Sequence, residues 1–211
     1  PPTSSTTEPD VPPSLPSTTS AGAAVALTIA GSDSGGGAGI QADIKAFSAL
    51  GVYATSVVTA LTAQNTVAVT DIHEIPTTNI AAQLTAVFAD IRVDAVKIGM
   101  LSSPEIIKTV ADGLQNYHGP VILDPVMVAK SGDMLLRSDA LNALRQQLLP
   151  MATLVTPNLP EAAVLLGESD ATTVAEAQRQ GRALLDLGAK AVLMKGGHFE
   201  HQDCIDLLIV A

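Results

Sequence analysis

From residue 25 onward, short apolar segments alternate with longer segments of helical periodicity. The apolar segments have the length of strands, and in the segments between them apolar residues recur every three or four positions. Expected strands cover residues 25–30, 53–61, 95–98, 121–123, 153–155, 191–194 and 206–210, and expected helices cover 39–50, 78–88, 104–117, 138–148 and 174–187. This order predicts right-handed crossovers and a doubly wound, mostly parallel α/β sheet with helices on both faces.

Composition supports this fold and narrows the range of partners. Hydrophobic residues make up 47% of the chain and aromatic residues only 2%, as expected when aliphatic strands are buried on both faces. A net charge of -10 disfavours nucleic acid as a partner. No apolar run in the sequence is long enough to span a membrane. The single cysteine, Cys204, excludes an internal disulfide and favours a reducing, cytoplasmic location.

Two regions differ in composition. Residues 1–22 are rich in Pro, Ser and Thr, and we expect a disordered tail or a linker there. Residues 23–211 then form the one α/β domain. Because the chain begins without Met, we expect a fragment or a processed product.

Polar and glycine-rich clusters follow most of the expected strands. Ligands bind beyond the carboxyl ends of strands in doubly wound folds, so this placement predicts an enzyme. The first cluster, residues 31–43, contains G-x-G-x-x-A at 37–42. It lacks the acidic residue about 20 positions later that dinucleotide enzymes use, and no P-loop lysine follows. A close approach of backbone to a ligand and a simple flexible turn are both compatible with it.

Each later cluster has a functional and a structural interpretation. The Gln64 amide could form hydrogen bonds with a heteroaromatic ring or a hydroxyl group of a ligand, but it could instead cap a loop. Met100 could pack on a ring or lie in the core. Asp124 could bind Mg²⁺, or it could simply begin a turn before proline. Lys195, followed by Gly196, could bind a phosphate, or its side chain could simply extend to solvent.

Asn158 and Glu161 have the spacing of a capping box, which explains both residues without any function. The same geometry would place a carboxylate beside a strand end, where Mg²⁺ and a phosphate could bind.

Taken together, the segments AGSDSGGGAGIQAD, TALTAQNT, KIGML, LDPVMVAKSG, TPNLPEA and KGGH resemble the hydroxymethylpyrimidine and phosphomethylpyrimidine kinases of the ribokinase-like superfamily. The resemblance covers roughly residues 25–210. It implies phosphorylation of 4-amino-5-hydroxymethyl-2-methylpyrimidine by ATP, and then of its monophosphate, in thiamine diphosphate biosynthesis.

The resemblance also implies a set of site residues. Mg²⁺ would bind Asp124 and Glu161, and Lys195 would be the catalytic lysine that reaches the phosphates. The pyrimidine would lie among Gly31, Ala38, Asp43, Gln64 and Met100, and ATP would bind Asn158, Lys195 and Gly196.

The chain departs from the family pattern at its end. The family continues for about fifty residues and contains a Gly-Thr-Gly-Cys turn whose N–H groups bind anions and whose Cys is the presumed base. This turn is absent from the sequence, and Cys204 lacks its glycine context. We therefore expect a truncated, incomplete ribokinase-like domain with little or no turnover by these 211 residues alone and with exposed apolar surface.

Three alternatives remain open from the sequence. A pyridoxal kinase shares the superfamily and the hydroxymethyl chemistry. A non-catalytic pyrimidine-binding module would explain the missing turn. The hypothesis of a dinucleotide-binding oxidoreductase is supported only by the G-x-G-x-x-A pattern. By analogy with the superfamily, we expect a possible homodimer.

Overall fold

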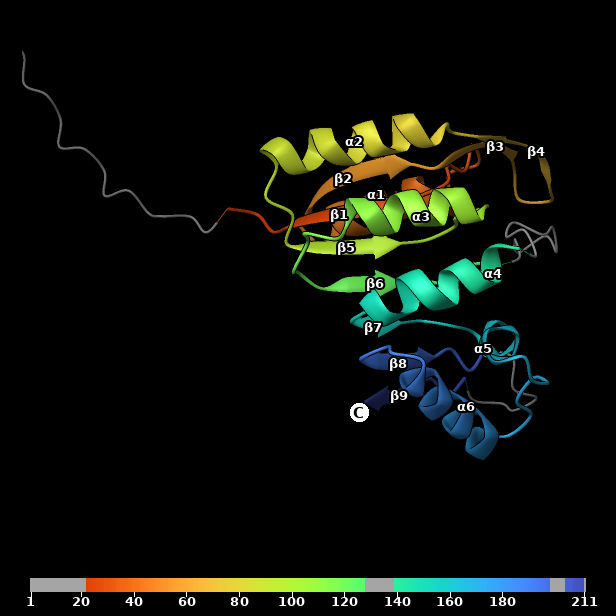
Figure 1. Ribbon diagram of the computed structural model, residues 1–211. Helices are drawn as coiled ribbons and strands as arrows, with labels where there is room; N and C mark the ends of the chain where they lie inside the picture. Colours follow the sequence, from red (N-terminus) through yellow and green to blue (C-terminus); the bar gives the residue numbers. More distant parts are fainter. Residues whose placement is uncertain (1–21, 128–138, 198–203, 211) are drawn as a thin grey trace, which may run out of the picture.

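The computed structural model describes residues 22–127, 139–197 and 204–210. Its main sheet has seven strands in the order β2-β1-β5-β6-β7-β8-β9 (Figure 1). All neighbouring strands are parallel except β8 and β9, which are antiparallel. The strands are β1 (Val25–Ala30), β2 (Tyr53–Val58), β5 (Ala95–Ile98), β6 (Val121–Leu123), β7 (Leu154–Val155), β8 (Ala191–Met194) and β9 (Leu207–Val210). The predicted doubly wound, mostly parallel sheet is confirmed.

Helices lie on both faces of the sheet. In Figure 1, α2, α3 and α4 lie in front of the strands and α1 lies behind β1 and β2. The helices are α1 (Gly39–Ala49), α2 (Thr77–Asp90), α3 (Pro104–Gly113), α4 (Ala140–Ala143), α5 (Leu159–Leu166) and α6 (Val174–Asp186). None of the helices in the described part of the chain is long and apolar enough to cross a membrane.

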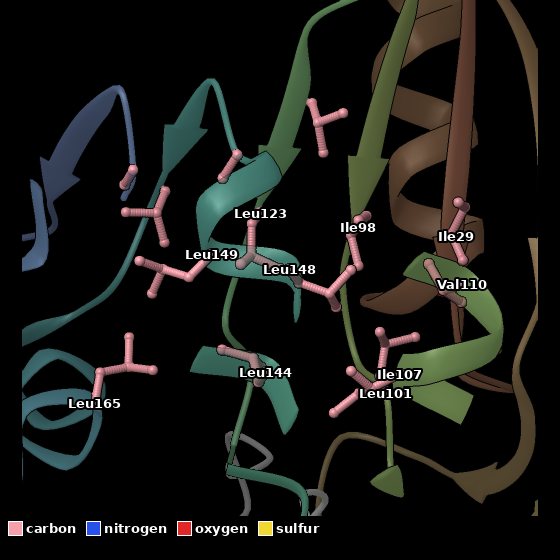
Figure 2. Packing of buried hydrophobic residues seen from close by; sticks show 14 of the residues in the cluster. Ile29, Ile98, Leu101, Ile107, Val110, Leu123, Leu144, Leu148, Leu149 and Leu165 are labelled. Carbon is pink, nitrogen blue, oxygen red and sulfur yellow. The ribbon is translucent and has the colours of Figure 1, made fainter. Parts of the chain in front are cut away.

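The main core lies between the sheet and the front helices. Ile29, Ile98 and Leu123 are aligned on neighbouring strands, and each is fully buried. Figure 2 shows them facing side chains of α3 and of the turns after α4, such as Ile107 and Leu148. Alternate residues of β1 and β5 point to the other face, so Thr28 and Lys97 lie on the side of α1.

The rear face of β6, β7 and β9 is less covered. Ile122 and Leu154 share the row of Thr28 and Lys97 and are only half-buried. On β9, Leu208 is 65% exposed and Val210 is 64% exposed. This matches the expected exposure of apolar surface.

One expectation for the second strand is corrected, and one strand was missed. The strand expected over 53–61 ends at Val58, and the chain then enters a separate antiparallel hairpin of β3 (Ala60–Gln64) and β4 (Val69–Glu74). The sequence analysis did not predict β4. All six of its residues are exposed or half-buried, so no buried apolar face marks it in the sequence.

Helix ends also differ from expectation. The helix expected over 104–117 ends at Gly113. In the segment expected to be helical over 138–148, α4 is followed by a π-helical turn, Leu144–Leu148, and a 3-10 turn, Leu149–Met151. The expected strands 95–98, 121–123 and 191–194 have the bounds that the structure shows.

Candidate active site

The candidate site is a cavity of about 310 Å³ at the carboxyl ends of β1, β5 and β6. The chain turns to one side of β1 to form β2 and to the other side to form β5, so the site lies at the switch point of the sheet. The cavity is lined by Ala30, Gly31, Ser32, Ala38, Gly39, Ala42, Asp43, Thr62, Gln64, Lys97, Gly99, Met100, Asp124 and Val126. It brings together all five residues expected to contact the pyrimidine.

Asp33 organises the glycine-rich loop from within. Its side chain is buried, and its carboxylate accepts the backbone N–H groups of Gly35, Gly37 and Ala38 at 2.7, 2.8 and 2.8 Å. The Asp33 N–H in turn donates to the side chain of Gln41 at 2.8 Å. These loop N–H groups are therefore occupied by the protein's own carboxylate. The loop contributes Gly31, Ser32, Ala38 and Gly39 to the wall of the cavity.

Serine side chains fasten this loop to β3. The Ser34 hydroxyl donates to the Gln64 carbonyl at 2.6 Å and accepts the Gln64 N–H at 2.8 Å. Ser32 makes the same kind of exchange with Thr62, whose hydroxyl donates to the Ser32 carbonyl at 2.8 Å. These contacts hold Gln64 beside the cavity, and Gln64 also accepts from the Thr62 hydroxyl at 3.2 Å.

Gly31 and Gly39 permit close packing at the cavity wall. A Cβ on Gly39, whose φ is +56°, would lie 2.3 Å from the Gly31 carbonyl oxygen. A Cβ on Gly31 would lie 2.5 Å from the Met100 methyl carbon. The side chain of Met100 therefore fills the space that a larger residue at position 31 would need.

Asp43 lies on α1 and faces β1 and β5. The Lys97 ammonium contacts both of its carboxylate oxygens, at 2.9 and 3.0 Å, and the Thr28 hydroxyl donates to one of them at 2.6 Å. Asp43 and Lys97 both line the cavity. The sequence analysis assigned no role to Lys97.

A second group of charges lies at the ends of β6, β7 and β8. Lys195 Nζ is 2.9 Å from Asp124 Oδ1 and 3.7 Å from Glu161 Oε2. Asn158 and Lys195 form a parallel β-bridge, so the strand ends hold them side by side. Asp124 lines the cavity, and the Thr156 hydroxyl also donates to it at 3.2 Å. Lys195 thus connects the expected metal and nucleotide residues to the pyrimidine cavity.

The predicted capping box at the start of α5 is confirmed. The Asn158 side chain accepts the Glu161 N–H, and the Glu161 carboxylate accepts the Asn158 N–H, each at 2.8 Å. Burial raises the pKa of the Glu161 carboxyl above its ordinary value, while the Asn158 N–H and nearby Lys195 oppose that shift. A buried carboxylate beside a second one, Asp124, favours a bound cation between them.

The remaining expected residues have mixed outcomes. The N–H of Gly196 donates to the Asp206 carboxylate at 2.9 Å, so a phosphate would have to compete with that contact. Cys204 is exposed. His198 and the part of the segment LDPVMVAKSG that follows Met127, residues 128–132, lie outside the described residues. Asp33, Ser32 and Lys97 are the site residues that sequence reasoning missed.

The two acidic residues fit a magnesium site of limited protein ligation. Within the described ranges, there is no group of three or more His, Cys, Asp or Glu side chains that could hold a metal ion. Mg²⁺ typically binds one or two carboxylates and completes its octahedron with water and substrate phosphates. Asp124 and Glu161 supply that number.

A larger cavity, of about 910 Å³, lies between α2 and α3 and contains none of the expected site residues. Its lining includes threonines, Phe88 and Tyr117 and only one acidic side chain, that of Asp112. Size therefore does not identify the reactive site in this molecule. The smaller cavity has the charged groups.

Comparisons with known proteins find a matching family. The family described as phosphomethylpyrimidine kinase matches residues 33–211. A hydroxymethylpyrimidine/phosphomethylpyrimidine kinase of Rhizobium meliloti is 56% identical over 184 residues, which are 87% of this chain and 69% of that protein. The crystal structure of phosphomethylpyrimidine kinase from Clostridium difficile 630 is 48% identical, with a TM-score of 0.82, over 89% of this chain and 80% of that one. Bacillus subtilis pyridoxal kinase, solved with ADP, is 37% identical, with a TM-score of 0.80, over 89% and 71%.

Proposed function

Because the chain belongs to the phosphomethylpyrimidine kinase family, we propose that it transfers the γ-phosphoryl group of ATP to 4-amino-5-hydroxymethyl-2-methylpyrimidine and then to the monophosphate. One observation carries this proposal: a single cavity contains the five pyrimidine-site residues and Asp124, which pairs with Lys195 at the neighbouring strand ends. A heterocycle in the cavity would thus lie next to charges suited to a triphosphate.

The charged group has the parts that phosphoryl transfer requires. We propose that Asp124 and Glu161 hold Mg²⁺, which when bound neutralises phosphate charge. Lys195 is held against Asp124, and its ammonium would donate to a phosphate oxygen when a nucleotide binds. Asn158 fixes the start of α5 and so the position of Glu161. These residues align and neutralise the reacting groups.

Neither carboxylate of the cavity is a free base. Asp43 is engaged by Lys97 and Thr28, and Asp124 by Lys195 and Thr156. The prediction that a Gly-Thr-Gly-Cys turn supplies the base therefore stays a prediction.

The test is an assay of phosphorylated products by mass spectrometry with the pyrimidine and Mg-ATP. It compares the 211-residue chain, a version extended by the family's C-terminal segment, and the Rhizobium meliloti enzyme as a positive control. We expect product from the extended version and little or none from the 211-residue chain. Robust turnover by the 211 residues alone would show that the base lies within them. Tight pyrimidine binding without product from either version would contradict the kinase proposal and favour a binding module.

Pyridoxal phosphorylation is the second candidate activity. It is supported by the solved pyridoxal kinases, including one from Staphylococcus aureus in complex with AMP-PCP and pyridoxal, which is 33% identical with a TM-score of 0.81. The higher identity of the pyrimidine kinases places the pyrimidine first. Parallel assays with both compounds separate the candidates. A higher kcat/KM for pyridoxal would reverse the order.

We also propose a homodimer. The support for this proposal is the analogy with the superfamily. Analytical ultracentrifugation of the version extended by the family's C-terminal segment tests it. A monomer at all concentrations would contradict it.

A further inference from the structure

We propose that Lys97 and Asp43 together read the amidine edge of the substrate, meaning a ring nitrogen and the amino group on the adjacent carbon. This makes Lys97 a specificity-determining residue of the site. The inference rests on the proposed function and deepens it.

Both groups reach the cavity from rigid elements. Lys97 lies within β5, and its side chain is 23% exposed; Asp43 lies within α1, and its side chain is 15% exposed. Both side chains line the cavity that also contains Gln64 and Met100. A pair that served only to join α1 to the sheet would not need to face this space.

The hydrogen bonds within the pair leave one acceptor and one donor unused. A carboxylate has about four lone-pair sites, and the contacts from Lys97 and Thr28 take three of them. Two fall on Oδ2 and one on Oδ1, so the remaining acceptor site is on Oδ1. An ammonium has three donors, and Lys97 directs two of them at Asp43. The pair therefore presents adjacent donor and acceptor positions to a ligand.

An aminopyrimidine has the complementary arrangement. Its exocyclic amino group donates, and the neighbouring ring nitrogen accepts. The amino group would donate to Asp43 Oδ1 and the ring nitrogen would accept from Lys97 Nζ. A ligand without that ring nitrogen would leave the charged Lys97 donor unpaired in a partly buried site, which is the situation that gives strong discrimination.

The test measures binding rather than turnover, so it does not depend on the identity of the base. Isothermal titration calorimetry compares 4-amino-5-hydroxymethyl-2-methylpyrimidine with the analogue in which CH replaces the ring nitrogen beside the amino-bearing carbon. We expect the unsubstituted chain to prefer the pyrimidine by about tenfold or more, because hydrogen bonds to charged groups are the strong ones. In Lys97→Met, that preference should fall to within about twofold of unity.

Lys108→Met is the matched control. Lys108 also pairs with a carboxylate, that of Asp112 at 2.7 Å, but on the exposed surface of α3 and away from this cavity. It should keep both the affinity and the preference. Asp43→Asn and the double variant complete a cycle, in which the double variant should lose little more than either single variant because the two side chains act as a unit.

Three outcomes decide the inference. If Lys97→Met binds both compounds more weakly but keeps the original preference, Lys97 only supports the structure and the inference is wrong. If the unsubstituted chain binds the pyrimidine without any preference over the analogue that lacks the ring nitrogen, the inference fails while the proposed function stands. If the unsubstituted chain binds neither compound, the proposed function fails and the inference fails with it.

Lys97→Gln guards against a folding defect. It keeps an amide donor near Asp43 without the charge, and circular dichroism checks that it folds. An intermediate preference supports the inference. A preference equal to that of the unsubstituted chain would overturn it.

Discussion

At the scale of single residues, Asp33 is the central determinant of the site although it does not line the cavity. A carboxylate that accepts three backbone N–H groups fixes a glycine-rich segment that would otherwise have many conformations. Because Ala38 and Gly39 follow that segment and line the cavity, the shape of the pocket depends on a side chain behind its wall. Asp33 is thus a positioning residue.

Asp33→Ala should leave three loop N–H groups without their acceptor. We expect a loss of about 1–3 kcal/mol in the free energy of unfolding and a larger fall in pyrimidine affinity than in Mg-ATP affinity. Urea denaturation and calorimetry measure the two effects. Asp33→Asn, which keeps one carbonyl oxygen, should lie between the parent and the alanine variant. Equal losses for both ligands would show that Asp33 does not act through the pyrimidine wall.

A substitution of Lys195 should affect Mg-ATP binding and pyrimidine binding differently. It contacts Asp124 but does not line the cavity. Lys195→Met removes a cation between two carboxylates, so Mg-ATP affinity should fall by about tenfold or more while pyrimidine affinity changes little. Calorimetry with each ligand alone checks this. A parallel fall in pyrimidine affinity would place Lys195 in the pyrimidine subsite instead.

At the scale of elements, backbone conformation at α1 contributes as much as side chains do. Gly39 begins α1 with a φ of +56°, and a Cβ there would meet the Gly31 carbonyl oxygen at 2.3 Å. The residue after α1's C-cap, Gly51, has a φ of +74°, but nothing lies within 4 Å of its added Cβ. The two glycines share one conformation and differ in their surroundings.

Gly51→Ala should therefore cost only the left-handed conformation, roughly 1–2 kcal/mol. Gly39→Ala adds a backbone clash and should cost more than about 2 kcal/mol, together with a loss of pyrimidine binding. Chemical denaturation of both variants gives the comparison. Similar losses would mean that the start of α1 can move away from Gly31 without difficulty.

Two capping boxes allow function to be separated from helix stability. Thr173 caps α6 with Glu176 as Asn158 caps α5 with Glu161, but only the second pair lies beside Lys195. Asn158→Ala and Thr173→Ala should each lower the free energy of unfolding by about 0.5–2 kcal/mol. Only Asn158→Ala should weaken Mg-ATP binding in calorimetry. If both variants keep Mg-ATP affinity, Asn158 is a cap and nothing more.

The sequence predicted the regular elements well and the contacts between distant elements poorly. Buried parallel strands are nearly continuous apolar runs, so 95–98, 121–123 and 191–194 were found with their bounds. The strands of the β3–β4 hairpin lack a clear apolar face, and the second of them was missed.

The same limit applies to the site. Motif residues near strand ends were predicted to lie together because a parallel sheet brings its carboxyl ends together, and six of the predicted site residues line one cavity. Lys97 is 54 residues from Asp43 and belongs to an apolar strand, so nothing local indicates their ion pair. Asp33 lies among glycines as any turn aspartate does, and only its buried contacts reveal its role.

At the scale of the whole molecule, the two ends of the parallel strands have different roles. The carboxyl ends hold the cavity and most of the functional charges. At the amino ends, Asp94 and Val25 join the starts of β5 and β1. The Val25 N–H donates to the Asp94 carboxylate at 2.9 Å, and the Asp94 N–H donates to the Val25 carbonyl at 2.8 Å. Changes at the amino ends of the strands should therefore alter stability and leave ligand affinity unchanged.

Asp94→Asn tests this division through its pH dependence. The Val25 N–H, with help from Arg92, holds the pKa of the Asp94 carboxyl below its ordinary value of 3.8. A lowered folded-state pKa means that this carboxylate stabilises the fold above the unfolded pKa and that its contribution is lost as the pH falls through the folded one. Asp94→Asn should therefore be less stable than the parent at neutral pH, and the difference should disappear in acid below that ordinary value. Thermal unfolding across this range measures it, and pyrimidine affinity at neutral pH should match that of the parent. A stability difference that stays constant into acid would mean that the asparagine disturbs packing rather than charge. Weaker pyrimidine binding would mean that the amino ends and the carboxyl ends of the strands are energetically coupled.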